Sequence, residues 1–318
     1  MRRVLILGGT AWLGREVARR AVDSGAEVVC LALGDSGDVP AGARLVRADR
    51  RQPGAYDALT GDWDDVVEIS YDAELVRSAL EALAARAAHW TLVSTISVYA
   101  RDDEPGADES ARLLEPGSNG YGEQKVAAER DTADAVGDRL LIARAGLIVG
   151  PGDPTDRFGY WPARLSRGGA VVVPETDDRF VQAIDVGDLA SWITSAGTRR
   201  RTGIVNAVGE PVPFGTYLAE VADVVGFDGA LRTLDDAALI AAGVDYWAGP
   251  RSLPLWLPAD ATGFARRCNR EFVASGGVLR PLRETIARTL VDEVERGVGR
   301  VRRAGLSAAA EAELLAGG

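Results

Sequence analysis

The chain has 318 residues, 47% of them hydrophobic, which is enough for a large core and too many for most single compact cores. The formal net charge of −11 disfavours a nucleic-acid partner, because phosphate binding needs basic patches. The only cysteines are Cys30 and Cys268 and the only histidine is His89, so no metal site built on thiolate or imidazole is expected. His89 precedes an apparent strand, where a structural role is more plausible than a place in a Ser-His-Asp triad. Any chemistry is therefore expected from Tyr, Ser/Thr, Lys, Asp/Glu or a bound cofactor.

Strand and helix patterns alternate through the first half of the chain. Short apolar runs predict strands, and apolar residues three to four positions apart predict helices. The predicted strands cover residues 3–8, 27–33, 43–49, 64–70, 90–100 and 139–150, and the predicted helices cover 12–25, 73–88 and 121–136. Residues 101–119 form a polar loop rich in Pro, Gly and Asp. Strands buried on both faces and separated by crossover helices indicate an α/β fold with a parallel, doubly wound sheet.

The second half of the chain is less regular. Turn residues after position 150 lead into a short helix, residues 179–196 predict a strand followed by a helix, and residues 202–209 predict another strand. The Trp- and Pro-rich residues 245–258 predict an ordered loop, and the chain ends in a short helix with Ser307 as its N-cap. We expect residues 1–150, with a return segment near 179–210, to form a dinucleotide-binding domain. Residues 151–318 would form mainly a smaller substrate-binding lobe.

No segment has the character of a membrane span or a signal peptide. The apolar run Val4–Leu7 is too short for a signal peptide and is soon followed by arginines, and no run approaches the 18 or so apolar residues that a span needs. With two unpaired cysteines, a cytoplasmic protein is expected. The sequence leaves the oligomeric state open, a homodimer being one option.

A glycine-rich turn joins the first predicted strand to the first predicted helix. In the stretch LILGGTAWLG, Gly8, Gly9 and Gly14 let the chain turn sharply and let a pyrophosphate approach the backbone. The start of the following helix would offer free N–H groups to the anion. As the first turn of a strand–helix–strand unit, this stretch predicts a dinucleotide site, whereas a plain tight turn is the alternative.

The end of the second predicted strand bears on the choice between NAD and NADP. An acidic residue there would hold the adenosine ribose of NAD, and a basic one would favour NADP. Ala32 and Leu33 stand at the expected position, and Asp35 follows about 20 residues after Gly14. Asp35 could hold the ribose or could be a turn residue, so NAD is favoured slightly and NADP stays open. Asp49, after the third strand, is a candidate for the adenine end.

The only lysine of the chain, Lys125, lies four residues after Tyr121 in the stretch YGEQK. Positions i and i+4 share one face of a helix, so the two side chains would point the same way. A fixed ammonium near a phenol lowers the tyrosine pKa and makes it a general acid/base near neutral pH. A solvated surface lysine would be preferred if the motif stood alone. However, strand hydroxyls precede it, and the carboxyl ends of such strands line the ligand crevice.

The stretches GGTAWLG, STISVYA, YGEQK and ARAGLIVGPGD, in this order, resemble the short-chain dehydrogenase/reductase superfamily. They look most like its extended branch of NAD-dependent epimerases and dehydratases, which has a Rossmann domain, and the resemblance covers about residues 1–210 well. It implies that Tyr121 is the acid/base, that Lys125 binds ribose and tunes Tyr121, and that Thr95 binds the substrate oxygen, with Ser94 and Ser97 as alternatives. The implied cofactor-binding residues of the turn are Gly8, Gly9, Thr10, Ala11, Trp12, Leu13 and Gly14.

Three positions depart from the pattern of that family. Ala11 replaces the middle glycine of the turn, so the phosphate approach is expected to be looser. Residues Thr95–Ser97 lack the Asp-Glu pair of the sugar-nucleotide dehydratases, which disfavours dehydration. Ala32 stands where the family has the acidic residue that binds the adenosine ribose of NAD.

The resemblance therefore implies an NAD(P)-dependent oxidoreductase or epimerase that acts at a hydroxyl or carbonyl carbon of a small, sugar-like or acidic metabolite by hydride transfer. Tyr121 would exchange the proton. The alternative is a regulator or scaffold that binds the cofactor without chemistry. The candidate substrate residues are Tyr99, Arg157, Tyr160, Trp161, Arg179 and Trp256, each of which could equally have a packing role.

Overall fold

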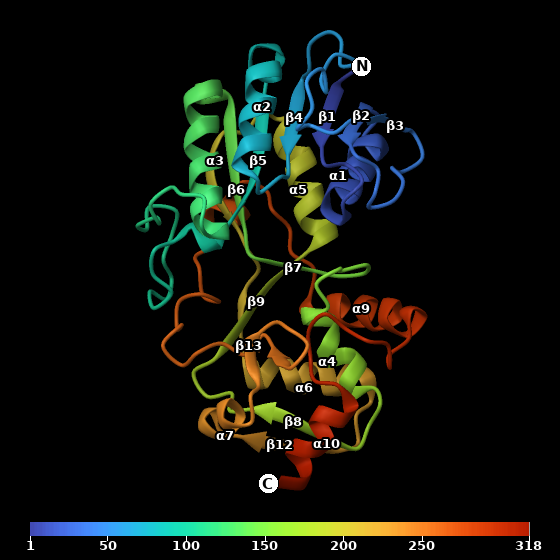
Figure 1. Ribbon diagram of the computed structural model, residues 1–318, viewed down its shortest axis with the longest axis vertical. Coiled ribbons are helices and arrows are strands. Elements are labelled where there is room, and N and C mark those ends of the chain that lie inside the picture. Colours follow the sequence, from blue (N-terminus) through green and yellow to red (C-terminus); the bar gives the residue numbers. More distant parts are fainter. Residues whose placement is uncertain (318) are drawn as a thin grey trace.

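Seven parallel strands form the central sheet of the computed structural model, which describes residues 1–317 (Figure 1). Their order is β10 (Gly203–Ala207), β6 (Leu140–Ala145), β5 (Trp90–Thr95), β4 (Asp65–Glu68), β1 (Arg3–Leu7), β2 (Glu27–Ala32), β3 (Ala43–Arg47). The central strands are apolar on both faces because helices cover both sides of the sheet. This sheet confirms the predicted α/β, doubly wound fold, and β10 adds the return segment to it.

Two helices cover each face of the sheet. Helices α1 (Trp12–Asp23) and α5 (Val186–Thr198) pack together on one face, and α2 (Ala73–Leu83) and α3 (Tyr121–Val136) pack on the other. The Asp72 side chain begins α2 by accepting hydrogen bonds from the amides of Glu74 and Leu75. Because the strands are parallel, their carboxyl ends all lie at one edge of the sheet. In a doubly wound fold the ligand crevice is found at this edge.

The predicted strand over residues 139–150 is wrong in one respect, because it is two strands. β6 ends at Ala145, and after Gly146 the chain forms β7 (Leu147–Val149), which pairs with β9 (Phe180–Asp185) in a sheet completed by β11 (Pro211–Pro213). A Cβ at Gly146 would lie 2.9 Å from Cγ1 of Val208. The chain therefore passes close to Val208 at this point, where glycine fits best. The predicted strand over 90–100 likewise ends at Thr95 and continues as a short 3₁₀ turn.

The second lobe has its own core, built mainly from residues after position 147. Its remaining elements are α4 (Arg157–Leu165), β8 (Ala170–Pro174), α6 (Phe214–Val225), β12 (Ala230–Leu234), α7 (Asp236–Ala241), β13 (Asp245–Trp247), β14 (Ser252–Pro254), α8 (Arg270–Ala274), α9 (Leu282–Arg296), α10 (Ala308–Gly317). The loop predicted over residues 245–258 is wrong in part, because β13 and β14 pair as parallel strands. The last helix begins as predicted, with the Ser307 hydroxyl accepting from the Ala310 amide at 3.1 Å, and residue 318 lies outside the described residues.

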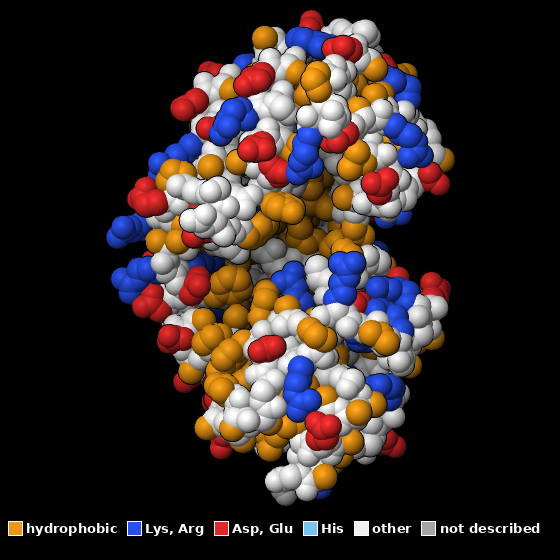
Figure 2. All heavy atoms as spheres, in the orientation of Figure 1, with side chains coloured by type: hydrophobic (Ala, Val, Ile, Leu, Met, Phe, Trp, Pro, Cys, Tyr) orange, Lys and Arg blue, Asp and Glu red, His pale blue; other side chains and the backbone are white. Residues whose placement is uncertain are grey.

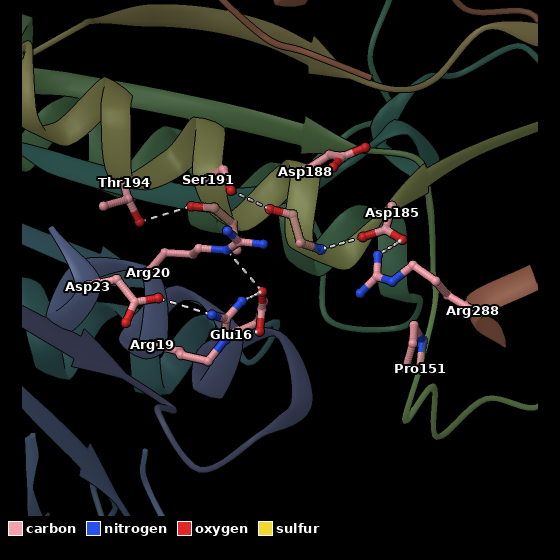
Figure 3. A network of polar contacts seen from close by, with 12 residues as sticks. Glu16, Arg19, Arg20, Asp23, Pro151, Asp185, Asp188, Ser191, Thr194 and Arg288 are labelled. Carbon is pink, nitrogen blue, oxygen red and sulfur yellow. Dashed lines mark hydrogen bonds and ion pairs between the residues drawn. The ribbon is translucent and has the colours of Figure 1, made fainter. Parts of the chain in front are cut away.

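A buried carboxylate joins the two lobes at the start of α5. Asp185 is 3% exposed, accepts from the Gly187 amide at 2.7 Å and lies 3.0 Å from Nη1 of Arg288 on α9 (Figure 3). Arg280 pairs with Asp188 at 2.6 Å beside it. These ion pairs link the start of α5 to α9 and to the segment that precedes it. Between the two lobes lies a hollow in which hydrophobic side chains gather (Figure 2).

None of the helices in residues 1–317 is both long enough and apolar enough to cross a membrane.

Candidate active site

Three positions of the glycine turn after β1 require glycine, Gly8 for its backbone conformation and Gly9 and Gly14 for lack of space. Gly8 has a φ of +95°, a backbone conformation that favours glycine. A Cβ at Gly9 would overlap the Cys30 side chain on β2, and a Cβ at Gly14 would overlap the carbonyl oxygen of Gly8. Ala11 has a φ of −69°, so its methyl group is accommodated without backbone strain. The substitution of alanine for the middle glycine therefore leaves the turn intact.

The turn opens onto a cleft of about 320 Å³ at the carboxyl ends of β1 to β4. Its lining includes Leu7, Gly8, Thr10, Ala11, Ala32, Leu33, Asp35, Asp49, Ser70 and Tyr71. The helix α1 starts at this cleft with Ala11 as its N-cap and without a side chain that caps it, so its first amides are free for an anion. The glycine cradle and the helix start therefore fit the pyrophosphate of a dinucleotide.

The other predicted residues of the turn hold it in place by contacts outside the cleft. Trp12 donates from Nε1 to the carbonyl oxygen of Pro151 at 2.8 Å, which holds the turn against the connection to the second lobe. Leu13 is buried in the core between α1 and the sheet. Gly9 and Gly14 allow close packing against Cys30 and Gly8.

Lys125 lies beneath the cleft and is only 2% exposed. Its Nζ donates to the carbonyl oxygens of Ser70 at 2.9 Å and Val93 at 2.5 Å, which leaves one of its three donors for another acceptor. Burial lowers the pKa of Lys125 to about 8, although the carboxylates of Glu68 and Glu129 act in the opposite direction. The ammonium is thus fixed between the strands β4 and β5.

The lowered pKa of Lys125 predicts how stability depends on pH. Between pH 8 and 10.5 the unfolded chain binds the proton that the folded protein has released, so the folded state gains stability as pH rises. We expect the free energy of unfolding of the wild type, relative to Lys125→Met, to rise by about 3 kcal/mol over that range. Urea unfolding of both proteins from pH 7 to 11 measures this difference and cancels the titration of Tyr and Cys. Parallel curves for the two proteins would contradict the prediction.

Tyr121 is the first residue of α3 and lies beyond the end of β5. Its side chain is 49% exposed, and its ring lies 6.0 Å from that of Tyr71, which lines the cleft. Desolvation of the hydroxyl raises the pKa of Tyr121, while the Thr95 side chain and the positive charge of Arg157 lower it. The direction is opposite to the one expected, because desolvation outweighs the charge of Arg157 and because Lys125 donates to backbone carbonyls instead of acting on the phenol. Thr95 and Arg157 therefore both act on the ionisation of the Tyr121 hydroxyl.

The alternative hydroxyls of the strand end have other surroundings. Ser94 donates to Glu129 at 2.5 Å, and Glu129 in turn pairs with the buried Arg144. Ser97 donates its amide to Oγ1 of Thr95 at 3.2 Å, which orients the threonine. Tyr99 is 4% exposed and bonds Asn206 at 2.5 Å, so it forms part of the wall behind the site.

Most of the candidate substrate residues lie inside the second lobe. Trp161 donates to the carbonyl oxygen of Pro254 and Trp256 donates to Asp236, and both indoles are fully buried. Arg179 pairs with the same Asp236 at 2.5 Å. Tyr160 is 2% exposed and also lies in this lobe, away from Tyr121. These contacts stabilise the lobe and leave Arg157 as the candidate beside Tyr121.

Arg157 forms no ion pair with any residue from 1 to 317. Its Nε donates to the Thr155 hydroxyl at 3.2 Å, and its guanidinium lies 4.9 Å from the ring centre of Trp247. Burial lowers the pKa of Arg157, while the charges of Asp153 and Tyr121 raise it. An unpaired, partly desolvated guanidinium beside the phenol is suited to an anionic group of a ligand.

Sequence patterns missed Tyr71, which lines the cleft, and Trp247, which lies beside Arg157 and packs on Phe264. Trp247 packs edge-on against Phe264, with ring centres 5.3 Å apart, and has a φ of +65°. These three side chains come from loops and short strands far apart in the chain, so no local spacing points to them. The His89 side chain lies at the opposite, amino end of β5, where it bonds Asp65 at 2.8 Å, in keeping with a structural role.

The fold and the cleft define a nucleotide-binding protein of the doubly wound class. Residues 4–208 match the family described as "NAD dependent epimerase/dehydratase family", and the chain belongs to that family. The suspected membership of the extended branch of the short-chain dehydrogenase/reductase superfamily is confirmed. The chain is accordingly an enzyme of the epimerase kind, a nicotinamide-dependent epimerase or oxidoreductase.

Solved structures of two epimerases and of a further NAD-bound enzyme have the same fold. UDP-glucuronic acid 4-epimerase from Bacillus cereus in complex with NAD is 15% identical, with a TM-score of 0.68 over 92% of this chain and 99% of that one. UDP-N-acetylglucosamine 4-epimerase from Bacillus cereus is 13% identical, with a TM-score of 0.68 over 93% and 100%. WbmG from Bordetella bronchiseptica in complex with NAD is 17% identical, with a TM-score of 0.67 over 93% and 95%. Comparison with curated proteins gave no match.

Proposed function

We propose that this protein interconverts a hydroxyl and a carbonyl group on a small acidic metabolite, with Tyr121 as the acid/base. The observation that carries the proposal is the place of Tyr121 beside the dinucleotide cleft, where its ring lies 6.0 Å from that of the cleft residue Tyr71 and where Thr95 and the charge of Arg157 act on its hydroxyl. A hydroxyl donor, a titratable phenol and a cation at the carboxyl end of a strand suit the binding and protonation of a carbonyl oxygen.

Thr95 and Tyr121 would act on the reacting oxygen of the substrate, and Arg157 on its anionic group. Thr95 would donate a hydrogen bond to the reacting oxygen, and Tyr121 would give that oxygen a proton as negative charge develops on it. The raised pKa keeps Tyr121 protonated at neutral pH, which suits the direction of carbonyl reduction. A nicotinamide dinucleotide, when bound in the cleft, would supply the hydride chemistry. The buried Lys125 would use its remaining donor to hold the ribose.

The acidic character of the substrate follows from Arg157. The guanidinium lies among Tyr121, Trp247 and Asp153 without an ion pair among the described residues, so a carboxylate or phosphate of the substrate would relieve its desolvation. The rings of Trp247 and Phe264 would cover the apolar part of the substrate. One relative of known structure is named for glucuronic acid, which also carries a carboxylate.

The cleft also bears on the coenzyme. Asp35 lines it next to Ala32 and Leu33, at the place where the adenosine ribose would lie. A carboxylate there would bond the ribose hydroxyls of NAD and repel the 2′-phosphate of NADP. We therefore propose NAD as the preferred coenzyme.

Coenzyme fluorescence and a panel of carbonyl compounds test this function. The protein is expected to bind NADH at least about tenfold more tightly than NADPH, since one like-charge contact costs about 1.4 kcal/mol or more. In the panel, each keto acid is paired with its uncharged amide, and the acids are expected to be reduced faster. Tight binding of NADH with no turnover of any compound would favour the regulator that binds the coenzyme without chemistry.

A further inference from the structure

A second pocket of about 250 Å³ lies in the second lobe, between the end of α4, residues 298–307 and the start of α10. It shares no lining residue with the dinucleotide cleft. Its polar lining includes Tyr160, Arg164, Arg167, Arg300, Arg302 and Ser307, and it includes no acidic side chain. An acid-free pocket with four arginines is unusual on a chain with a net charge of −11.

The carboxylates behind the pocket do not balance all of its arginines. Arg164 pairs with Glu311 at 2.5 Å, and Arg302 pairs with Glu293 at 2.6 Å. Arg300 reaches Glu293 at 3.2 Å and also contacts Asp156. Three of the four arginines thus pair with three carboxylates, and one positive charge of the pocket has no carboxylate partner in the described part of the chain.

Arg167 is the arginine without a counter-ion. It forms no ion pair within residues 1–317, and its side chain is exposed at the mouth of the pocket. Desolvation lowers the pKa of Arg167, and the positive charges of Arg164 and Arg302 lower it further. Like charges that crowd one cavity indicate a place where an anion would be stabilised.

Several hydrogen-bond donors at this pocket have no partner among the described residues. The hydroxyl of Tyr160, Nε of Arg300 and Nη1 of Arg302 are all buried and unpaired, and Tyr160 is only 2% exposed. The backbone of Leu306 approaches the Tyr160 hydroxyl but makes no hydrogen bond of ordinary geometry with it. Buried donors without acceptors are rare in folded proteins and are accounted for when an acceptor from outside completes them.

The first turn of α10 adds backbone donors to the same place. Ser307 caps this ten-residue helix through the Ala310 amide, and Ser307 and Ala308 both line the pocket. The amides of Ala308 and Ala309 have no acceptor in the described structure. The positive end of the helix dipole therefore faces the arginines.

We propose that this pocket binds a phosphoryl group, separately from the dinucleotide cleft. Guanidinium forks match the oxygens of a phosphate in pairs, and free amides at a helix start bind the same group. A volume of about 250 Å³ holds one or two phosphates and excludes a nucleic-acid strand, which the net charge also disfavours.

Calorimetric titration with inorganic pyrophosphate tests the site on three full-length proteins: the wild type, Arg167→Gln and Arg232→Gln. Arg232 is the matched control, because it is an exposed arginine of the same lobe that forms no ion pair with a described residue. We expect Arg167→Gln to weaken the binding about tenfold, the usual effect of losing one charged hydrogen bond, and Arg232→Gln to leave it within about twofold. Any binding at the glycine turn is the same in all three proteins and cancels.

Two outcomes would overturn the proposal. In one, Arg167→Gln and Arg232→Gln bind pyrophosphate equally well, and in the other, no protein shows saturable binding. Titration of the same proteins with inorganic phosphate and with ADP then distinguishes the source of the group. A preference for ADP that depends on Arg167 supports a nucleotide ligand, whereas equal affinity for ADP and pyrophosphate supports a site for the phosphoryl group alone.

Discussion

Replacing Tyr121 with phenylalanine is expected to lower kcat/KM for carbonyl reduction by about 10²–10⁴-fold, the usual contribution of a positioned acid/base. The substitution removes only the hydroxyl, and the ring retains its contact with Tyr71. Because, among the described residues, only Thr95 acts on that hydroxyl as a hydrogen-bonding side chain, stability and NADH affinity are expected to stay close to those of the wild type. Steady-state kinetics and coenzyme fluorescence on the same samples provide both measurements.

The matched control for this variant is Tyr246→Phe. Tyr246 lies in the second lobe, where its hydroxyl makes a 3.3 Å contact with Asp236, so the same chemical change occurs away from the cleft. The control is expected to keep its activity. If Tyr121→Phe retained full activity while binding NADH normally, the acid/base role would have to pass to another group.

The second large effect is expected from Gly14→Ala. A Cβ at this position would overlap the carbonyl oxygen of Gly8 and would lie 3.0 Å from Cα of Gly9. The new methyl group would clash with backbone atoms, which cannot move aside by a change of side-chain rotamer. Helix α1 must then move away from the turn. We expect a loss of about 1–3 kcal/mol in the free energy of unfolding. We also expect at least about a tenfold loss of NADH affinity, because the helix start no longer faces the pyrophosphate.

Gly299→Ala is the control for the glycine variant. Gly299 has open space around the position of a Cβ and a φ outside the left-handed region, so alanine is expected to be tolerated there. Urea unfolding and fluorescence titration with NADH compare the two variants. A Gly14→Ala protein that binds NADH as the wild type does would show that the pyrophosphate does not depend on this turn.

The fold class and the first cofactor contacts could be predicted because their signals are local. All six strands predicted in the first half became strands of the parallel sheet, four of them close to the expected bounds. The strand predicted over 90–100 ended at Thr95, and the one predicted over 139–150 continued into β7 of another sheet. Apolar runs and glycine spacing reflect burial and backbone sterics, which depend on neighbouring residues. The split at Gly146 escaped prediction, because its cause is the approach of Val208 from a distant part of the chain.

The candidate site shows the same division. The pairing of Tyr121 and Lys125 on one helix is a matter of spacing, and the sequence by itself determined that both residues begin α3 next to the end of β5. Which charge acts on the phenol was decided only by the tertiary structure. Lys125 is bound by the carbonyls of Ser70 and Val93, so the cation beside Tyr121 is Arg157 from the other lobe.

The physical reason is the range of the interactions involved. Backbone conformation and the alternation of buried and exposed residues follow from the chain's local chemistry, and these determined the sheet, the glycine turn and the helix that carries Tyr121. Electrostatic and packing partners depend on distance in space, and elements far apart in the sequence brought Arg157, Trp247 and Phe264 together. The direction of the Tyr121 pKa shift and the arginine pocket at α10 are therefore properties of the folded molecule alone.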